Sequence, residues 1–400
     1  MKVYLVGGAV RDKLLGYPTN EYDYVVVGAT PEQMQAQGFT PVGKDFPVFL
    51  HPETKDEYAL ARTERKTGHG YQGFTFDTST EVTLEEDLGR RDITINAIAQ
   101  LDNGELVDPY NGQNDIDRRV LRHVSEAFRE DPVRVLRIAR FASRYHHLGF
   151  TIAKETKALM GTMVASGEVA HLVSERVWKE FSRALGERSP HVFLEVLHEC
   201  GALKVIMPQI DHLISLHTSE QPPQLSPPAL RALNYACSIS DKSTVRLATL
   251  LHDLDKQNAT ANPMGKPSPE LVELTELAGK LMIPNEYREL CSLVIRFHKY
   301  VDRALSLLAE DILDLLTKTD SLRRPERFKD LLTTCKSYAV GTEKLKERKY
   351  KQERYLLEAL EVISTVNPQA LLAQGFSGKA LGDAIAKQRI EKLEEFKSQQ

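Results

Sequence analysis

The feature that most limits the possible folds is a change in hydrophobic periodicity after Pro109. Residues 1–110 mix helical stretches with short β-type runs such as VYLVGG, EYDYVVVG, FPVFLHP, DEYALAR and ELVDPY. From about residue 114 onward, apolar residues recur almost only at helical spacing, as in DPVRVLRIARFASRYHHLG, SERVWKEFSRALGE and HVFLEVLHECGALKVI. The sequence therefore predicts the α+β class, with an N-terminal mixed sheet followed by an all-helical remainder.

The size of the chain allows several domains with large cores. It has 400 residues, of which 42% are hydrophobic and 27% charged. Four prolines in the twelve residues HTSEQPPQLSPP predict a linker at 217–228, and ATANPMGKPSPE predicts a second loop at 259–270. The four cysteines lie far apart with no C-x-x-C pair, which indicates neither a zinc cluster nor a disulfide framework.

The sequence shows neither a targeting signal nor a strong net charge. No apolar run approaches the roughly 20 residues that a membrane helix needs. The apolar start MKVYLVGGAV is followed at once by Arg11, Asp12 and Lys13, which is not typical of a secretory signal. We therefore expect a cytoplasmic protein without a membrane partner. The net charge of −4 gives no global sign of a nucleic-acid partner, although a local basic surface would suffice.

The first motif is GGAVRDKLLG, which follows the apolar run VYLV. Gly7 and Gly8 favour a tight turn, and a helix starting near Val10 would present free backbone N–H groups to an anion. Arg11 adds a charge for a phosphate. Taken alone, a Gly-Gly turn more often has only a structural role.

The second motif is the acid pair of EYDYVVVG. Strand alternation places Glu21 and Asp23 on the same side, where two carboxylates can share divalent cations. A pair of Mg²⁺ ions held in this way lowers the pKa of an attacking hydroxyl and stabilises a leaving pyrophosphate. Glu57, at the start of EYALAR, is the candidate third carboxylate. The alternative for all three acids is a solvated strand end.

Two further motifs are rich in arginine. In EEDLGRRDITINAIA, Arg90 and Arg91 suit phosphate or ribose contacts, whereas Asp92 is expected to cap a helix. In REDPVRVLRIARFASRY, Asp131 before a proline is a good helix N-cap. Arg134 opens a series of arginines along one side of that helix, which continues with Arg137, Arg140 and Arg144.

These helix arginines alternate with apolar residues, so the helix face is expected to be partly buried. No equivalent run of acids accompanies them in the sequence. Partly buried arginines need an anionic partner, and a nucleoside triphosphate would supply one.

Together, LVGGAVRDKLLG, EYDY, RRDITINAIA, EDPVRVLRIARF and SERVWKE resemble the class II tRNA nucleotidyltransferases, the CCA-adding enzymes. The resemblance is greatest to the bacterial type with an additional HD domain, and it extends to GFSGKALGDAIAKQRI near the C-terminus. It implies a polymerase β-like head at residues 1–140, a helical neck at 141–215, a degenerate HD-like body at 229–305 and a tRNA-binding tail at 306–400. It also implies CCA addition to tRNA, or its repair, with CTP, ATP and Mg²⁺.

The resemblance assigns the phosphate and metal contacts to the first two motifs. Gly8 and Arg11 match positions that hold the triphosphate. Glu21 and Asp23 match the acid pair that ligates Mg²⁺, and Glu57 matches the third strand acid; these three would be catalytic. The family pattern has Asp at the first position, so Glu21 is a departure that adds one methylene to the ligand.

The later motifs would hold and select the nucleotide. Arg91 matches an arginine that contacts the nucleotide, and Arg137 and Arg140 match further triphosphate or base contacts. Asp131 and Arg134 match the E-D-x-x-R element that reads the Watson–Crick edge of CTP or ATP. A carboxylate accepts from the exocyclic amino group that C and A share, whereas G and U present the wrong pattern. Glu175 and Arg176 in SERVWKE match a neck motif that supports the site.

The HD region departs from the pattern of active HD hydrolases. LATLLHDLDKQ supplies His252 and Asp253, but the nearest other histidines are His217 and His298. We therefore expect that phosphohydrolase activity is lost and that this region is a helical spacer. The tail segment EKLKERKYKQERY at 343–355 is rich in Lys and Arg, which suits either tRNA phosphates or a solvated face.

Several alternatives stay open on the sequence. Enzymes that add only CC or only A share these motifs, and the loop between Arg62 and Arg90 does not decide among them. Bacterial poly(A) polymerases carry a G-R-R-F-type stretch where this chain has Gly43, Lys44, Asp45 and Phe46. An HD phosphohydrolase and a non-catalytic RNA-binding protein are further alternatives from other classes.

Overall fold

The computed structural model describes residues 1–19, 21–42, 48–66, 74–215, 226–252, 254, 269–342 and 349–399. The chain divides into two compact units, Met1–Ile206 and Met207–Gln400. Most of the expected linker and loop, at 217–225 and 259–268, lies outside the described residues, as do Gly43, Lys44, Asp45 and Phe46. No helix in the described part of the chain has the length and apolar character to cross a membrane.

The first unit contains a mixed seven-stranded sheet in the order β3-β4-β5-β2-β1-β8-β9. Its centre is β2 (Asp23–Val27), which runs antiparallel to β1 (Lys2–Val6) and parallel to β5 (Glu57–Leu60). The outer strands are β3 (Thr40–Pro41), β4 (Val48–Leu50), β8 (Ala99–Gln100) and β9 (Leu106–Val107). A separate hairpin pairs β6 (Thr63–Lys66) with β7 (Phe74–Asp77).

Both faces of this sheet are covered, because neighbouring residues of β2 belong to different cores. Val25 packs with Val6 and Leu88 in one cluster, whereas Val26 packs with Met34 and Leu60 in another. The covering helices include α2 (Pro31–Ala36) and α3 (Leu84–Gly89). A strand buried on both faces is rigid, so it is a good support for the side chains at its ends.

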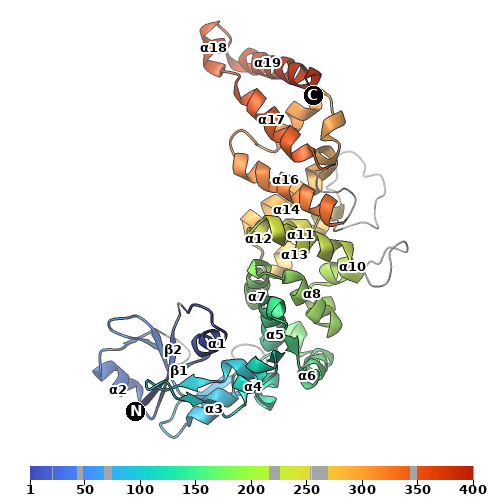
Figure 1. The fold of residues 1–400 in the computed structure, drawn as a ribbon. Helices are drawn as coiled ribbons and strands as arrows, with labels where there is room; N and C mark the ends of the chain where they lie inside the picture. Colours follow the sequence, from blue (N-terminus) through green and yellow to red (C-terminus); the bar gives the residue numbers. More distant parts are fainter. Residues whose placement is uncertain are drawn as a thin grey trace. The chain divides into compact units, whose positions relative to one another are not determined.

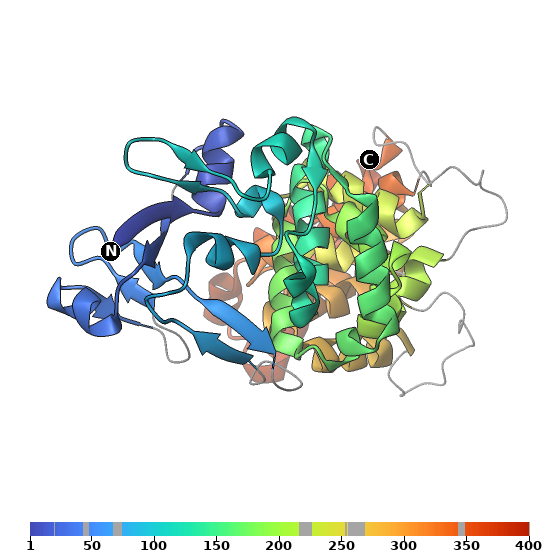
Figure 2. The same ribbon diagram turned by 90° about the horizontal axis from the view of Figure 1, so that it is seen from below.

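Helices make up most of the rest of the first unit. They are α1 (Gly8–Leu14), α4 (Gly112–Asp117), α5 (Val133–Tyr145), α6 (Lys154–Ala165), α7 (Ser174–Gly186), α8 (Pro190–Glu199) and α9 (Ala202–Ile206). Figures 1 and 2 show the sheet strands in blue on one side of this unit and α5 to α8 in teal and green on the other. Helix α5 packs against both α7 and α8, with Val135, Leu136 and Ile138 fully buried.

The second unit is helical throughout its described residues. Its helices are α10 (Pro208–Ser215), α11 (Pro228–Ile239), α12 (Ser243–Leu250), α13 (Pro269–Leu281), α14 (Asn285–Asp302), α15 (Ala309–Lys318), α16 (Pro325–Gly341), α17 (Gln352–Ser364), α18 (Pro368–Ala373) and α19 (Gly378–Ser398). The main contact joins α11 to α16. It is close enough that a Cβ at Gly341 would lie 2.5 Å from the Cα of Ala232.

The predicted fold class is confirmed: a mixed-sheet head precedes a largely helical chain. One detail of the periodicity argument is wrong, because Val120–Leu121 and Thr151–Ile152 form a short parallel strand pair within the region expected to be almost only helical. The division into head, neck, body and tail stays a prediction.

Candidate active site

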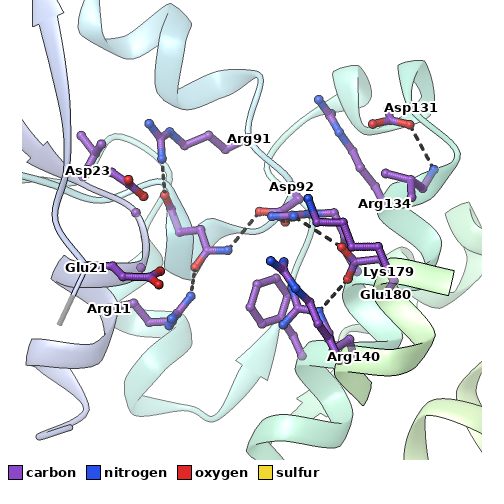
Figure 3. A pocket seen from close by; sticks show the side chains of 18 of the residues that line it. Arg11, Glu21, Asp23, Arg91, Asp92, Asp131, Arg134, Arg140, Lys179 and Glu180 are labelled. Carbon is purple, nitrogen blue, oxygen red and sulfur yellow. Dashed lines mark hydrogen bonds and ion pairs between the residues drawn. The ribbon is translucent and has the colours of Figure 1, made fainter. Parts of the chain in front are cut away.

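The first unit contains a cavity of about 1580 Å³, lined by the sheet on one side and by α5 and α7 on the other. Figure 3 shows Glu21 and Asp23 on one side of it and Arg134, Arg140 and Lys179 on the other. All ten site residues predicted from the sequence line this cavity: Gly8, Arg11, Glu21, Asp23, Glu57, Arg91, Asp131, Arg134, Arg137 and Arg140.

The sheet supplies three carboxylates to the cavity wall. Asp23 is the first residue of β2, and the strand register places it beside Val6 of β1 and Glu57 of β5. Glu57 opens β5, as expected. Glu21 precedes the strand, so strand alternation does not set its direction as predicted. It lines the cavity from the segment that leads into β2.

These carboxylates form no ion pair with a cation among the described residues. Glu21, Asp23 and Glu57 are exposed at the cavity wall, and none of them forms an ion pair or a side-chain hydrogen bond with a described residue. Partial desolvation by the surrounding wall raises the pKa of Asp23; Arg91 opposes this shift and Glu21 adds to it. Two acids that repel each other in this way are stabilised by a bound cation.

The donor set fits Mg²⁺ in particular. Across the described residues, no three His, Cys, Asp or Glu side chains are grouped closely enough to hold a metal by themselves. Glu21 and Asp23 with Glu57 therefore do not form a closed cage. Mg²⁺ usually keeps several waters and takes one or two carboxylates together with substrate phosphates, which is what this open pair of oxygen ligands offers.

The glycine turn brings Arg11 to the same cavity. Helix α1 begins at Gly8, earlier than predicted, after Gly7 with φ 70°. L side chains rarely adopt this positive φ, so the position favours glycine; a Cβ there would also lie 2.8 Å from Nη1 of Arg91, at the end of a flexible side chain. Arg11 is buried, donating to Asp12 at 2.8 Å and to Asn96 at 2.5 Å. Its guanidinium also lies 5.5 Å from the centre of the Phe141 ring.

The adjacent arginines of the third motif share one buried acid. Asp87 is fully buried at the end of α3, 2.7 Å from Nη2 of Arg90 and 3.2 Å from Nη2 of Arg91. Burial alone would raise the pKa of Asp87, but the two guanidinium groups lower it below its usual range. Asp87 therefore holds both arginines at the cavity wall.

Asp92 does not cap a helix, contrary to the prediction. The following 3₁₀ turn, Thr94–Asn96, has Ile93 as its N-cap and no side-chain cap bond. Instead, Asp92 accepts from Asn96 at 3.1 Å and from both Nε and Nη2 of Arg137 at 2.7 Å. Burial would raise the pKa of Asp92, but Arg137 and Asn96 hold it well below the usual range. Asp92 is thus a buried anchor for Arg137.

The expectation that the α5 arginines lack acidic partners is also wrong. Glu180 of α7 accepts from Nε of Arg140 at 2.6 Å and lies 3.9 Å from Arg137. Arg144 lies 3.6 Å from Asp12. The acids come from elements distant in sequence, so no run of acids near the arginines was needed.

Asp131 is joined to the start of α5 and to α7. Its Oδ1 accepts from the backbone N–H of Val133 at 3.1 Å, one residue after the predicted start of the helix. Arg176 donates to Oδ1 at 3.0 Å and to Oδ2 at 2.6 Å. Arg134 is buried and donates to the carbonyl of Ala127 at 2.7 Å. Asp131 is therefore both a partial cap and one half of a bidentate ion pair.

Sequence reasoning missed the acids that organise the arginines and two cations on α7. The missed residues that line the cavity are Asp92, Asn96, Lys179, Glu180 and Arg183. A signal for Lys179 and Arg183 was present, because they share the polar face of an amphipathic helix whose other face buries Val177 and Phe181, whereas Glu180 is buried with these apolar residues.

The comparisons with known proteins agree with this geometry. Residues 3–122 match the family described as the poly A polymerase head domain, and residues 149–214 match the family described as a probable RNA- and SrmB-binding site of polymerase A. The first unit therefore has the fold of a nucleotidyltransferase head.

Similarity over the full length defines the family. The chain is 52% identical over 407 residues to the multifunctional CCA protein of Teredinibacter turnerae, covering 100% of this chain and 99% of the relative. It is 50% identical over 410 residues to that of Alcanivorax borkumensis, with coverage of 100% and 99%. The chain belongs to the family of multifunctional CCA proteins.

Solved structures share the fold at lower identity. The Thermotoga maritima CCA-adding enzyme complexed with tRNA-CCA is 21% identical, with a TM-score of 0.66 and coverage of 98% of this chain and 87% of that chain. The Bacillus stearothermophilus CCA-adding enzyme in complex with CTP is 23% identical, with a TM-score of 0.63 and coverage of 97% and 88%.

The Asp92 anchor generates a stability prediction. Asp92→Asn should lower the free energy of unfolding of the first unit by about 2 kcal/mol, because Arg137 loses its nearer carboxylate and keeps only Glu180 at 3.9 Å. The pKa of Asp92 is lowered by folding, so its contribution is complete above the unfolded pKa of about 3.9 and is lost as the pH falls below that value. The difference from wild type should thus be constant between about pH 5 and 8 and shrink below about pH 4.

Urea unfolding followed by tryptophan fluorescence measures this difference, because the chain has one tryptophan, Trp178, on α7 of the first unit. Exposed Asp117, on α4, gives the control Asp117→Asn, which should unfold as wild type does. An Asp92→Asn protein as stable as the control would contradict the anchor role.

Proposed function

We propose that this enzyme adds C, C and A to the 3′ end of tRNA, using CTP and ATP as substrates and contacting the tRNA acceptor stem. Full-length identity of 52% and 50% to multifunctional CCA proteins supports this activity. Solved CCA-adding enzymes of the same fold have been described with CTP, with ATP and with tRNA-CCA, which supports the same substrates here. Because tRNA is the substrate, we place the activity in the cytoplasm.

One observation supports the proposal most: a pair of carboxylates and a carboxylate–arginine pair lie on opposite sides of one cavity. Glu21 and Asp23 line the sheet side without cation partners, and Asp131 and Arg134 line the α5 side. A metal-dependent transfer needs a carboxylate pair such as Glu21 and Asp23. Selection of a base without a template needs a hydrogen-bond acceptor and donors, which Asp131 and Arg134 supply.

Glu21 and Asp23 are the residues that would hold Mg²⁺, with Glu57 beside Asp23 on the neighbouring strand. Bound Mg²⁺ supplies activation of the 3′-hydroxyl and stabilisation of the leaving pyrophosphate. The contribution of the chain is to fix the acid pair at the end of a strand that is buried on both faces. The extra methylene of Glu21 keeps the same carboxylate ligand with a longer reach.

Asp131 and Arg134 are proposed to select the base. Each carboxylate oxygen has two acceptor positions. Oδ1 of Asp131 uses its two for Val133 and Arg176, whereas Oδ2 accepts only from Arg176 among the described residues and keeps a position for an exocyclic amino group. Arg134 supplies donors for the ring nitrogen and carbonyl of C or for the ring nitrogen of A. G and U do not match this arrangement.

The other predicted residues are proposed to hold the sugar and the triphosphate: Gly8, Arg11, Arg91, Arg137 and Arg140. Their acidic partners do not prevent this role, since a guanidinium has five donors and a carboxylate pair uses one or two of them. Arg137, for example, directs Nε and Nη2 to Asp92.

We also propose the boundaries 1–140, 141–215, 229–305 and 306–400 for head, neck, body and tail, with tRNA contacts in the tail. The basic segment 343–348 lies outside the described residues.

The HD region is proposed to be inactive as a hydrolase. His252 is 3% exposed, and its ring stacks on Tyr338 with centres 3.9 Å apart and lies 4.4 Å from the ring of His298. Such packing suits a core residue rather than a metal ligand open to substrate. Asp253 and His217 lie outside the described residues.

Base selection is the first test. With tRNAs lacking the last one, two or three nucleotides and each labelled nucleotide offered separately, CTP and ATP should be incorporated in turn, and GTP and UTP should not. Asp131→Ala should reduce this selectivity about tenfold to a hundredfold, because the acceptor for the amino group is lost. Unchanged selectivity with only a lower melting temperature would assign Asp131 to the helix start and the Arg176 pair alone.

The acid pair gives the second test. Asp23→Ala should reduce transfer at least about a thousandfold with an unchanged circular dichroism spectrum, since the reacting hydroxyl is no longer activated. Glu21→Asp, which restores the usual family residue, should remain active. An active Asp23→Ala enzyme beside an inactive Glu21→Asp enzyme would exclude the assignment of the metal ligands.

Hydrolysis of 2′,3′-cyclic nucleotides and phosphomonoesters gives the third test. We expect no turnover with added Ni²⁺, Mn²⁺ or Mg²⁺, because one His-Asp pair does not fill a coordination shell. Turnover that disappears in the double variant His252→Ala, Asp253→Ala would overturn the inactive assignment.

A further inference from the structure

Helix α7 presents two cations to the cavity that the assignments above do not use. Lys179 and Arg183 follow Arg176 at helical spacing, so the three share one face of α7. The opposite face is held in the core by Val177 and Phe181, which are 2% and 1% exposed. Lys179 and Arg183 are therefore fixed at the wall of the cavity while their side chains stay exposed.

These two residues differ from five other cations of the cavity wall in having no acidic partner among the described residues. Arg11, Arg91, Arg137, Arg140 and Arg176 each form an ion pair with a carboxylate of the first unit. Among the described residues, neither Lys179 nor Arg183 forms one. Glu180 of α7 and Glu187, which follows the helix, are directed to Arg140, and Glu175 of α7 forms no ion pair with a described residue.

The pairing of α7 with α5 shows where these cations lie along the cavity. Arg176 of α7 pairs with Asp131 just before α5. Glu180 pairs with Arg137 and Arg140 in the middle of α5. Glu187, just beyond the end of α7, also lies near Arg140. The two helices therefore run in parallel. Lys179 is level with the middle of α5, and Arg183 lies about 6 Å further along α7.

The helix that follows the glycine turn, α1, lies against the C-terminal end of α5. Arg11 of α1 lies against the rings of Phe141 and Tyr145, and Asp12 lies 3.6 Å from Arg144. A nucleotide whose base lies at Asp131 and whose phosphates lie near Gly8 and Arg11 would thus extend along α7 past Lys179 toward Arg183.

We propose that Lys179 and Arg183 form a second phosphate-contacting row, which binds the triphosphate of the incoming nucleotide from the α7 side. This inference rests on the proposed function. The triphosphate carries several negative charges, and no described residue forms an ion pair with either of these two side chains. The phosphodiester backbone of the tRNA 3′ strand offers the same chemistry, so the experiment separates the two sources.

Calorimetric titration of the full chain with CTP and Mg²⁺, without tRNA, tests the row. Lys179→Ala and Arg183→Ala should each weaken CTP binding about tenfold, and the double variant should weaken it further. Binding of cytidine, followed by NMR line broadening, should be unchanged because cytidine has no phosphate. Lys179→Arg and Arg183→Lys should retain CTP affinity within about threefold of wild type.

Matched controls are available in the same unit. Lys204 on α9 and Arg118, which follows α4, are exposed cations outside the cavity lining, so Lys204→Ala and Arg118→Ala should bind CTP as wild type does. In a second arm, gel shifts with tRNA that lacks its terminal nucleotide, in the absence of CTP, should show unchanged affinity for the α7 variants.

Three results would overturn the inference. Unchanged CTP binding in the double variant would exclude the row, and equal loss of CTP and cytidine binding would indicate a structural effect. Loss confined to tRNA binding would assign the two residues to the RNA backbone and overturn the triphosphate assignment. If the wild-type chain binds neither CTP nor ATP, the proposed function fails and the inference fails with it.

Discussion

The site depends on the buried ion pair between Asp92 and Arg137. Asp92 is held by Asn96, which also accepts from Arg11, and Arg137 lies beside Glu180, which accepts from Arg140. Hydrogen bonds and ion pairs therefore connect the glycine turn, the loop after α3, α5 and α7. Charges taken out of water are costly unless they are paired, so each member of this series restricts the position of the next. The cavity wall is consequently organised by the protein alone, before any ligand binds.

The ion pairs within the cavity wall also show which charged side chains are left to interact with a ligand. Among the described residues, Glu21 and Asp23 on the sheet side have no ion-pair partner, and neither have Lys179 and Arg183 on α7. A complex of a divalent cation with a polyphosphate carries both complementary charges. Electrostatic stabilisation of a transferring phosphoryl group requires fixed charges of this kind on both sides of the reacting atoms. The proposed nucleotidyl transfer and the proposed row on α7 use the same distribution of charge.

Local sequence patterns predicted the helices and strands well, but they did not predict which charged side chains pair with each other. The change of periodicity after Pro109 predicted the α+β class, and the register of β2 with β5 brings Glu57 beside Asp23, as the motif required. Asp92 was misassigned as a helix cap because an acid before an apolar run fits that role locally, whereas its partner Arg137 is 45 residues away. The α5 arginines were expected to lack acids for the same reason, since Glu180 follows Arg140 by 40 residues.

The sequence by itself determined the fold class, the order of the motifs and ten of the residues that line the cavity, because these follow from hydrophobic periodicity and from residue types at short spacing. Only the tertiary structure decided which charges neutralise each other and which remain available to a ligand. Lys179 and Glu180 are neighbours in the chain, yet Glu180 is buried against Arg140 while Lys179 is exposed at the cavity wall. The physical reason is that a charge is neutralised by whatever lies within a few ångströms in space, and in this fold those neighbours come from helices and loops that the chain brings together from distant positions.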